Sequence, residues 1–96
     1  SVPLVFSFSN LEALCGACLR LQKQIPHLIL QSKLYRTQEG YQLIVWSYCR
    51  LEQRLLRIVR EYGRLAGKGS IASAWTREHG KALLEQDAVS VMAKLG

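Results

Sequence analysis

The chain has 96 residues, of which 49% are hydrophobic and 21% charged, and this balance is typical of one folded domain. No apolar run approaches the roughly 20 residues that a membrane-spanning helix requires, so we expect no membrane partner. The formal net charge of +6 permits acidic partners, either protein or nucleic acid, but does not determine the fold. Three cysteines cannot all pair with one another, which favours a reducing compartment, and we expect a cytoplasmic protein.

A strand is predicted over 3–8, followed by a helix over 10–23. The strand has the period of two of a half-buried strand, with one face made by Leu4, Phe6 and Phe8. The helix has an apolar stripe at offsets of three and one, made by Leu11, Leu14, Cys15, Cys18 and Leu19. Ser9 or Asn10 can cap the helix. Ile25-Pro26 ends it, because the residue before proline is pushed out of the α region.

The sequence CGAC at 15–18 has the spacing of a thioredoxin-type redox motif and of half a zinc site. A redox cysteine opens its helix, where the dipole lowers the thiol pKa, whereas Cys15 lies about a turn and a half inside. Zinc needs further ligands, and Cys49, His27 and His79 are scattered along the chain. We therefore expect both cysteines of the motif to be buried, reduced and metal-free, with no cofactor. A thiol enzyme that uses Cys15 stays as an alternative.

Residues 31–47 contain two β-rich runs, which predict strands over 32–37 and 41–46. The turn Gln38-Glu39-Gly40 separates them, and Gly40 can supply the positive φ of a short hairpin. The second run is more apolar than the first, so we expect it to lie nearer the centre of a sheet.

The segment 48–62 is predicted to be a helix. Its apolar face is made by Tyr48, Leu51, Leu55, Ile58, Val59 and Tyr62. The other side carries what we call the arginine ridge, which consists of Arg50, Arg54, Arg57 and Arg60. Such a ridge is either a solvated helix face or a surface for phosphates or an acidic protein. No aromatic residue interleaves with these arginines, so a stacking platform for single strands is not indicated. Gly63 is expected to end the helix in a left-handed cap.

The sequence GKGS at 67–70 invites comparison with a phosphate-binding loop but has the wrong spacing from Gly63. Gly69 also stands where that motif needs the serine or threonine that binds magnesium. The segment follows a predicted helix rather than a strand, so we expect a flexible turn. A short strand over 70–75 is predicted after it.

The last part of the chain contains Glu78-His79, an acid beside a base. Adjacent residues rarely point together and no nucleophile accompanies them, so a turn is predicted there. A strand is predicted over 81–86. Asp87 then caps a final helix, whose inward side is expected to contain Val91, Met92 and Leu95.

Taken in order, these elements predict a single α+β domain over 1–96, in which helices pack on one face of a small antiparallel sheet. No group of residues has the composition and spacing of an active site. The residues alone therefore indicate a basic module for binding or structure, and not an enzyme.

Four stretches of the chain resemble the C-terminal domain of the MecA family of adaptor proteins, and they occur in the family's order. They are FSFSNLEALCGACLRL at 6–21, SKLYRTQEGYQLIV at 32–45, REYG at 60–63 and REHGKALLEQDAV at 77–89. The resemblance spans nearly the whole chain, and its last stretch is the most specific. The chain departs from the family in its basic charge and in the short space between hairpin and second helix.

The resemblance implies a non-catalytic adaptor domain that docks on a ClpC-type Hsp100 AAA+ unfoldase. In this family the domain promotes assembly of the unfoldase into the hexamer that works with the ClpP protease in regulated proteolysis. A separate N-terminal domain captures substrates, and the start at Ser1 leads us to expect a piece of a longer protein. The matching motifs offer as partner-binding residues Tyr62, Glu78, His79, Gly80 and Lys81. We add the arginine ridge because it is the surplus charge of the chain.

Besides the thiol enzyme, a second alternative to the adaptor stays open. The helix at 48–62 would serve a basic nucleic-acid-binding module through its arginines. Homodimerisation is also left open by the sequence.

Overall fold

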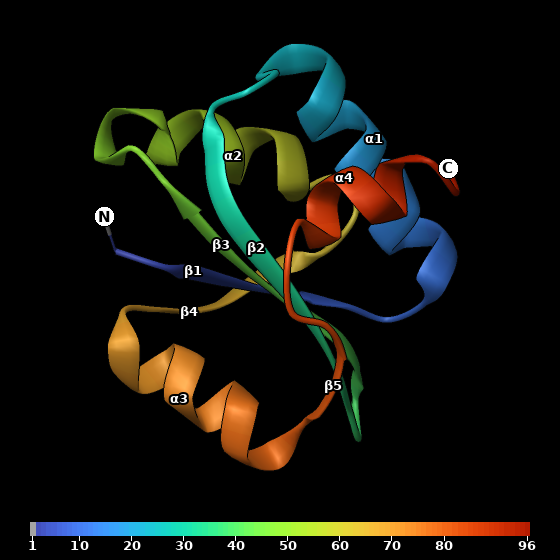
Figure 1. Ribbon diagram of the computed structural model, residues 1–96, viewed down its shortest axis with the longest axis vertical. Helices are drawn as coiled ribbons and strands as arrows, with labels where there is room; N and C mark the ends of the chain where they lie inside the picture. Colours follow the sequence, from blue (N-terminus) through green and yellow to red (C-terminus); the bar gives the residue numbers. More distant parts are fainter. Residues whose placement is uncertain (1) are drawn as a thin grey trace.

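The computed structural model describes residues 2–96, which form a five-stranded sheet with helices on both faces (Figure 1). The elements in chain order are β1 (Leu4–Phe8), α1 (Leu11–Gln24), β2 (Ile29–Thr37), β3 (Gly40–Ser47), a 3-10 turn (Cys49–Leu51), α2 (Glu52–Val59), β4 (Arg64–Lys68), α3 (Ser70–His79), β5 (Lys81–Leu84) and α4 (Ala88–Ala93). The strands lie in the order β4-β1-β3-β2-β5, and each neighbouring pair is antiparallel. The predicted α+β class with an antiparallel sheet is confirmed. Helices α1, α2 and α4 pack on one face of the sheet as predicted, whereas α3, which the sequence did not predict, packs on the other face.

The hairpin of β2 and β3 forms the centre of the sheet, as the sequence predicts. Thr37 pairs with Gly40 at the turn, and Gly40 has a φ of 139°. A Cβ at this position would also collide with the carbonyl oxygen of Phe8. The turn therefore needs glycine both for its backbone conformation and for the close approach of β1.

The main core lies between one face of the sheet and the helices α1, α2 and α4. Phe6 of β1 pairs with Leu43 of β3, and Leu43 pairs with Leu34 of β2, so all three side chains point toward these helices. The predicted alternation of β1 is therefore correct for this face. The expectation that β1 is half-buried is wrong, because Val5 and Ser7 on its second face are buried as well.

Helix α1 begins and ends where local chemistry predicts. Of the two candidate caps it is Asn10 that acts, since its Oδ1 accepts a 2.8 Å hydrogen bond from the Ala13 amide. The helix ends at Ile25, before proline. Leu11 of the predicted apolar face is largely exposed, since it lies in the first turn, at the end of the buried stripe.

Helix α4 packs along α1, and the link between them is partly polar. Gln22 Nε2 donates a 3.1 Å hydrogen bond to Ser90 Oγ. The predicted inward face is correct for Met92 but wrong for Val91 and Leu95, which are exposed. The inward face of α4 differs from the predicted one because Ala88, Val89 and Ala93 fill the space next to α1.

Helix α2 is shorter than predicted and ends at Val59, before Gly63. The expected left-handed cap is wrong, since Gly40 and Gly69 are the described glycines with positive φ. Gly63 is required for another reason. A Cβ there would collide with the carbonyl oxygen of Ser7 and would lie 2.7 Å from the Phe8 ring.

Helix α3 is the main correction to the predicted elements. The expected flexible turn at 67–70 is the end of β4 followed by the start of α3, and the expected strand at 70–75 is helical. Because the segment follows a strand and not a helix, its place in the chain does not argue against a phosphate-binding loop. The wrong spacing and Gly69 still exclude one. The small residues of α3 face the second side of the sheet, where Ala72 packs near Val5 and Ile44. A strand is predicted for residues 70–75 from the sequence, whereas this contact with the sheet stabilises a helix.

A buried hydrogen bond fixes α3 to the sheet. Thr76 Oγ1 donates to Gln42 Oε1 over 2.5 Å, and both residues are buried. We expect Thr76→Val to lower the free energy of unfolding by about 1–3 kcal/mol, because it leaves the amide oxygen unpaired. Urea denaturation would measure this, with Thr37→Val as the control on the half-buried edge of the hairpin. Equal midpoints for both variants would contradict the expectation.

Candidate functional site

The arginine ridge lies on the solvent side of α2 and the turn before it, and all four side chains are exposed. Two of them have intramolecular contacts. The guanidinium of Arg50 lies 5.1 Å from the centre of the Tyr48 ring, and Arg54 Nη2 donates a 3.1 Å hydrogen bond to the Gln24 carbonyl oxygen. The side chains of Arg57 and Arg60 have no hydrogen bond or ion pair with any residue from 2 to 96. The ridge therefore contains two anchored and two unpaired guanidinium groups.

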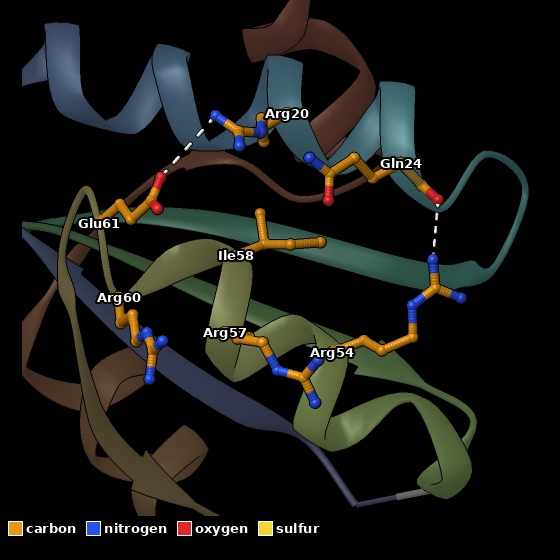
Figure 2. A pocket seen from close by; sticks show the side chains of 7 residues that line it. All are labelled: Arg20, Gln24, Arg54, Arg57, Ile58, Arg60 and Glu61. Carbon is orange, nitrogen blue, oxygen red and sulfur yellow. Dashed lines mark hydrogen bonds and ion pairs between the residues drawn. The ribbon is translucent and has the colours of Figure 1, made fainter.

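A groove of about 260 Å³ runs between α1 and α2, and the ridge forms one of its walls. Figure 2 shows a contact between the two helices at either end of it. At one end Arg20 lies 3.8 Å from the carboxylate of Glu61, and at the other Arg54 reaches the last turn of α1. Ile58 lies between these contacts, so the groove combines guanidinium groups with an apolar floor.

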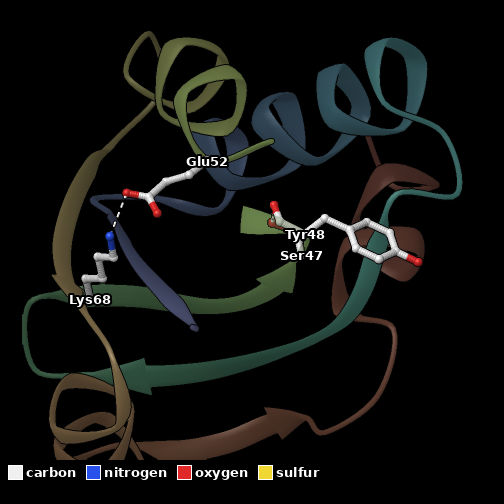
Figure 3. A network of polar contacts seen from close by, with 4 residues as sticks. All are labelled: Ser47, Tyr48, Glu52 and Lys68. Carbon is white, nitrogen blue, oxygen red and sulfur yellow. Dashed lines mark hydrogen bonds and ion pairs between the residues drawn. The ribbon is translucent and has the colours of Figure 1, made fainter. Parts of the chain in front are cut away.

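A second groove of about 220 Å³ lies on the other side of α2, against β4. Its apolar part is formed by Phe6, Leu56 and Leu65, and Leu65 is 43% exposed. Arg57 and Arg60 border this groove as well as the first. Figure 3 shows how α2 is held at this edge, where Lys68 Nζ of β4 lies 2.9 Å from Glu52 Oε1.

Tyr62 follows α2 and is half-buried against α1. Its Cε1 would lie 2.8 Å from a Cβ at Gly16, so the ring fills the space that this glycine leaves. Its hydroxyl accepts a 3.4 Å hydrogen bond from Arg20 Nη1. Tyr62 thus lies beside the ridge and packs between the two helices.

The predicted site residues at 78–81 lie elsewhere, at the end of α3 and the start of β5. The predicted turn at Glu78-His79 is wrong, because both residues belong to the last turn of α3. The His79 ring stacks on Trp75 with 4.3 Å between centroids, and its Nδ1 lies 2.9 Å from the Trp75 carbonyl oxygen. A Cβ at Gly80 would lie 2.8 Å from the Thr76 carbonyl oxygen, so close packing requires glycine.

The structure does not bring the two groups of predicted site residues together. Helix α2 covers one face of the sheet and α3 the other, so the ridge and residues 78–81 form separate surfaces (Figure 1). Glu78 and Lys81 are exposed on theirs.

The cysteines of the CGAC sequence belong to the core, which confirms the prediction that they are buried. Cys15 is 7% exposed and Cys18 is 0% exposed. Burial, with a smaller contribution from Cys15, raises the pKa of the Cys18 thiol from 9.0 to about 12. Across residues 2–96 no three His, Cys, Asp or Glu side chains group in a way that would hold a metal ion.

Two surface features were missed by the sequence prediction. Ile71 is 87% exposed and Trp75 is 49% exposed, and they lie one turn apart on α3. Their helical spacing was present in the sequence, but the segment was assigned to a strand. The contact of Arg20 with Glu61 had no local signal, because it depends on how α1 packs on α2.

Together, these features define a class of small α+β domain that presents separate charged and apolar surfaces around one antiparallel sheet. The family described as negative regulator of genetic competence (MecA) matches residues 1–92, and the chain belongs to this family. Comparison with curated proteins finds no match. Among the described residues no helix has the length and apolar character needed to cross a membrane.

Two solved structures share the fold. The crystal structure of the C-terminal domain of YpbH has a TM-score of 0.77 and 17% identity, and the match covers 96% of each chain. A chain in a cryo-EM structure of the MecA–ClpC complex has a TM-score of 0.73 and 22% identity, and the match covers 97% of this chain and 94% of that one. At these identities the likeness concerns the arrangement of the elements.

Proposed function

We propose that this domain is a non-catalytic adaptor module that docks on a ClpC-type unfoldase in the cytoplasm and promotes its assembly for regulated proteolysis. The observation that carries the proposal is membership of the MecA family over residues 1–92. The shared fold with a chain of a MecA–ClpC complex supports it. The exposed, partly unpaired arginines are consistent with a role in binding a macromolecule rather than in chemistry.

The ridge and residues 78–81 are two candidate docking surfaces within this proposal. The ridge is favoured by its charge, since surface charge accelerates association with a complementary partner. Glu78, His79 and Lys81 are favoured by their place in the most specific family motif. Tyr62 and Gly80 support these surfaces by packing. Tyr62 fills the space beside Gly16, and Gly80 leaves room for the Thr76 carbonyl oxygen.

Calorimetric titration of the domain with the unfoldase of its own organism tests the proposal. We expect binding that weakens as the salt concentration rises, together with a larger unfoldase assembly on size-exclusion chromatography. Arg54→Glu with Arg57→Glu is expected to weaken binding on the order of tenfold, because each exposed pair contributes up to about 1 kcal/mol. Glu78→Lys with Lys81→Glu tests the second surface without changing the net charge.

A duplex oligonucleotide in the same titration tests the alternative function. Binding to the duplex at physiological salt, with none to the unfoldase, would overturn the adaptor proposal and support a nucleic-acid-binding module. Binding to the unfoldase that ignores the arginine reversal but not the change at 78 and 81 would keep the adaptor and move its docking surface to α3.

A further inference from the structure

The charge of the ridge is concentrated where the fold leaves it unpaired. Among residues 2–96, three basic side chains outside the ridge lie near carboxylates, since Arg20 is near Glu61, Arg64 is near Glu39 and Lys68 contacts Glu52. Arg57 and Arg60 find none among residues 2–96, although positions three apart are neighbours on a helix surface and their like charges repel. An anion bound between them would relieve this repulsion as well as gain charge-assisted hydrogen bonds.

The groove between α2 and β4 gives these two arginines apolar neighbours. On the side of β4, Leu65 pairs with Phe6 and shares its face of the sheet, but no element formed by residues 2–96 lies beyond this edge to cover it. Its side chain is 43% exposed in a groove that Leu56 also lines. An apolar side chain placed in this groove would gain roughly 25 cal/mol for each Å² that it removes from water.

We propose that α2 carries a two-sided docking site for an acidic protein segment. Arg57 and Arg60 bind carboxylates of that segment, while one of its apolar side chains enters the groove between α2 and β4 and covers Leu65. This inference rests on the proposed function, because the segment is expected to belong to the unfoldase. It adds that the unfoldase segment must present carboxylates together with an apolar side chain.

A protein segment fits this surface better than a nucleic acid does. A phosphate backbone has no side chain to place against Leu56 and Leu65. Nucleic-acid binding is therefore kept as an outcome of the test.

A peptide titration tests the site independently of the unfoldase. The probe is a fluorescent peptide of glutamate residues that contains two leucines, and binding is followed by anisotropy and by amide chemical shifts of the domain. We expect shifts confined to α2 and β4. Arg57→Glu with Arg60→Glu should weaken binding on the order of tenfold, and Leu65→Ser roughly fivefold.

Matched controls separate this site from charge in general. Arg36→Glu with Lys94→Glu lowers the net charge equally on exposed residues outside both grooves, and it should change binding little. Arg57→Gln with Arg60→Gln removes the charges without reversing them and should give an intermediate loss. A peptide with serines in place of leucines should bind as weakly to the native domain as the leucine peptide binds to Leu65→Ser.

Three results of the titrations with peptides and the duplex would overturn the inference. The first is equal binding of the peptides with leucine and with serine, and the second is equal loss in the control reversal. The third is tighter binding of a duplex oligonucleotide than of the peptide at physiological salt. If the native domain binds the unfoldase while the charge reversals at 57 and 60 and the Leu65→Ser change leave that binding unaltered, the inference fails and the proposed function stands. If the peptide binds as expected but the unfoldase does not, the proposed function fails.

Discussion

In the native protein a small thiol reagent is expected to modify Cys49 readily, while Cys18 reacts about a thousandfold more slowly. The reactive species is the thiolate, and the pKa of Cys18 is raised from 9.0 to about 12, which lowers its thiolate fraction near neutral pH by about that factor. Burial adds to this protection, since Cys18 is fully enclosed and Cys49 is exposed. Cys15 is also buried and is expected to be protected until the chain unfolds.

Mass spectrometry of the labelled protein would measure these rates, with labelling in urea as the control for full reactivity. Rapid modification of Cys15 in the native state would contradict the core assignment and would favour the thiol-enzyme alternative. If Cys49, like the other two cysteines, were labelled only after unfolding, its exposure would be contradicted.

The same pKa shift makes stability depend on pH in a defined window. Above the unfolded pKa of 9.0 the unfolded chain loses the Cys18 proton, whereas the folded chain keeps it up to about pH 12. Ionisation therefore favours the unfolded state, and stability from this group falls as the pH rises through that window. The slope approaches about 1.4 kcal/mol per pH unit, and Cys18→Ala should remove this contribution.

Replacing Gly63 with alanine is expected to destabilise the domain by about 3 kcal/mol. The new Cβ would meet the carbonyl oxygen of Ser7 and lie 2.7 and 2.9 Å from two atoms of the Phe8 ring. Ser7 and Phe8 belong to a strand that is paired on both sides, so neither can move aside without breaking the sheet. Thermal and urea unfolding would measure the loss.

Gly16→Ala is the matched comparison for this prediction. Its Cβ would lie 2.8 Å from a ring atom of Tyr62, which is a side chain and can rotate away. We therefore expect a smaller loss, of about 1 kcal/mol. A Gly63 variant as stable as the Gly16 variant would show that the segment between α2 and β4 approaches β1 less closely than the contacts imply.

Local patterns determined most of the secondary structure. The period of two over 3–8, the apolar run over 41–46 and the apolar stripes of α1 and α2 each arise from neighbouring residues, so they are visible without tertiary information. The failure lies at 64–79, where a short edge strand and a helix rich in small residues have weak local signals. There the choice of helix depends on contacts of Ala72 and Thr76 with the second face of the sheet.

Composition and periodicity were enough to predict a basic α+β domain, a buried CGAC sequence and a helix with a ridge of arginines. Which of those charges remain unpaired among residues 2–96 depends on how the helices pack. Arg54 contacts Gln24 because α1 packs against α2, and no such neighbour reaches Arg57 or Arg60 among the described residues. The separation of the ridge from residues 78–81 is likewise a property of the sheet between them. Charge and periodicity are local, whereas pairing and separation depend on residues that folding brings together from distant parts of the chain.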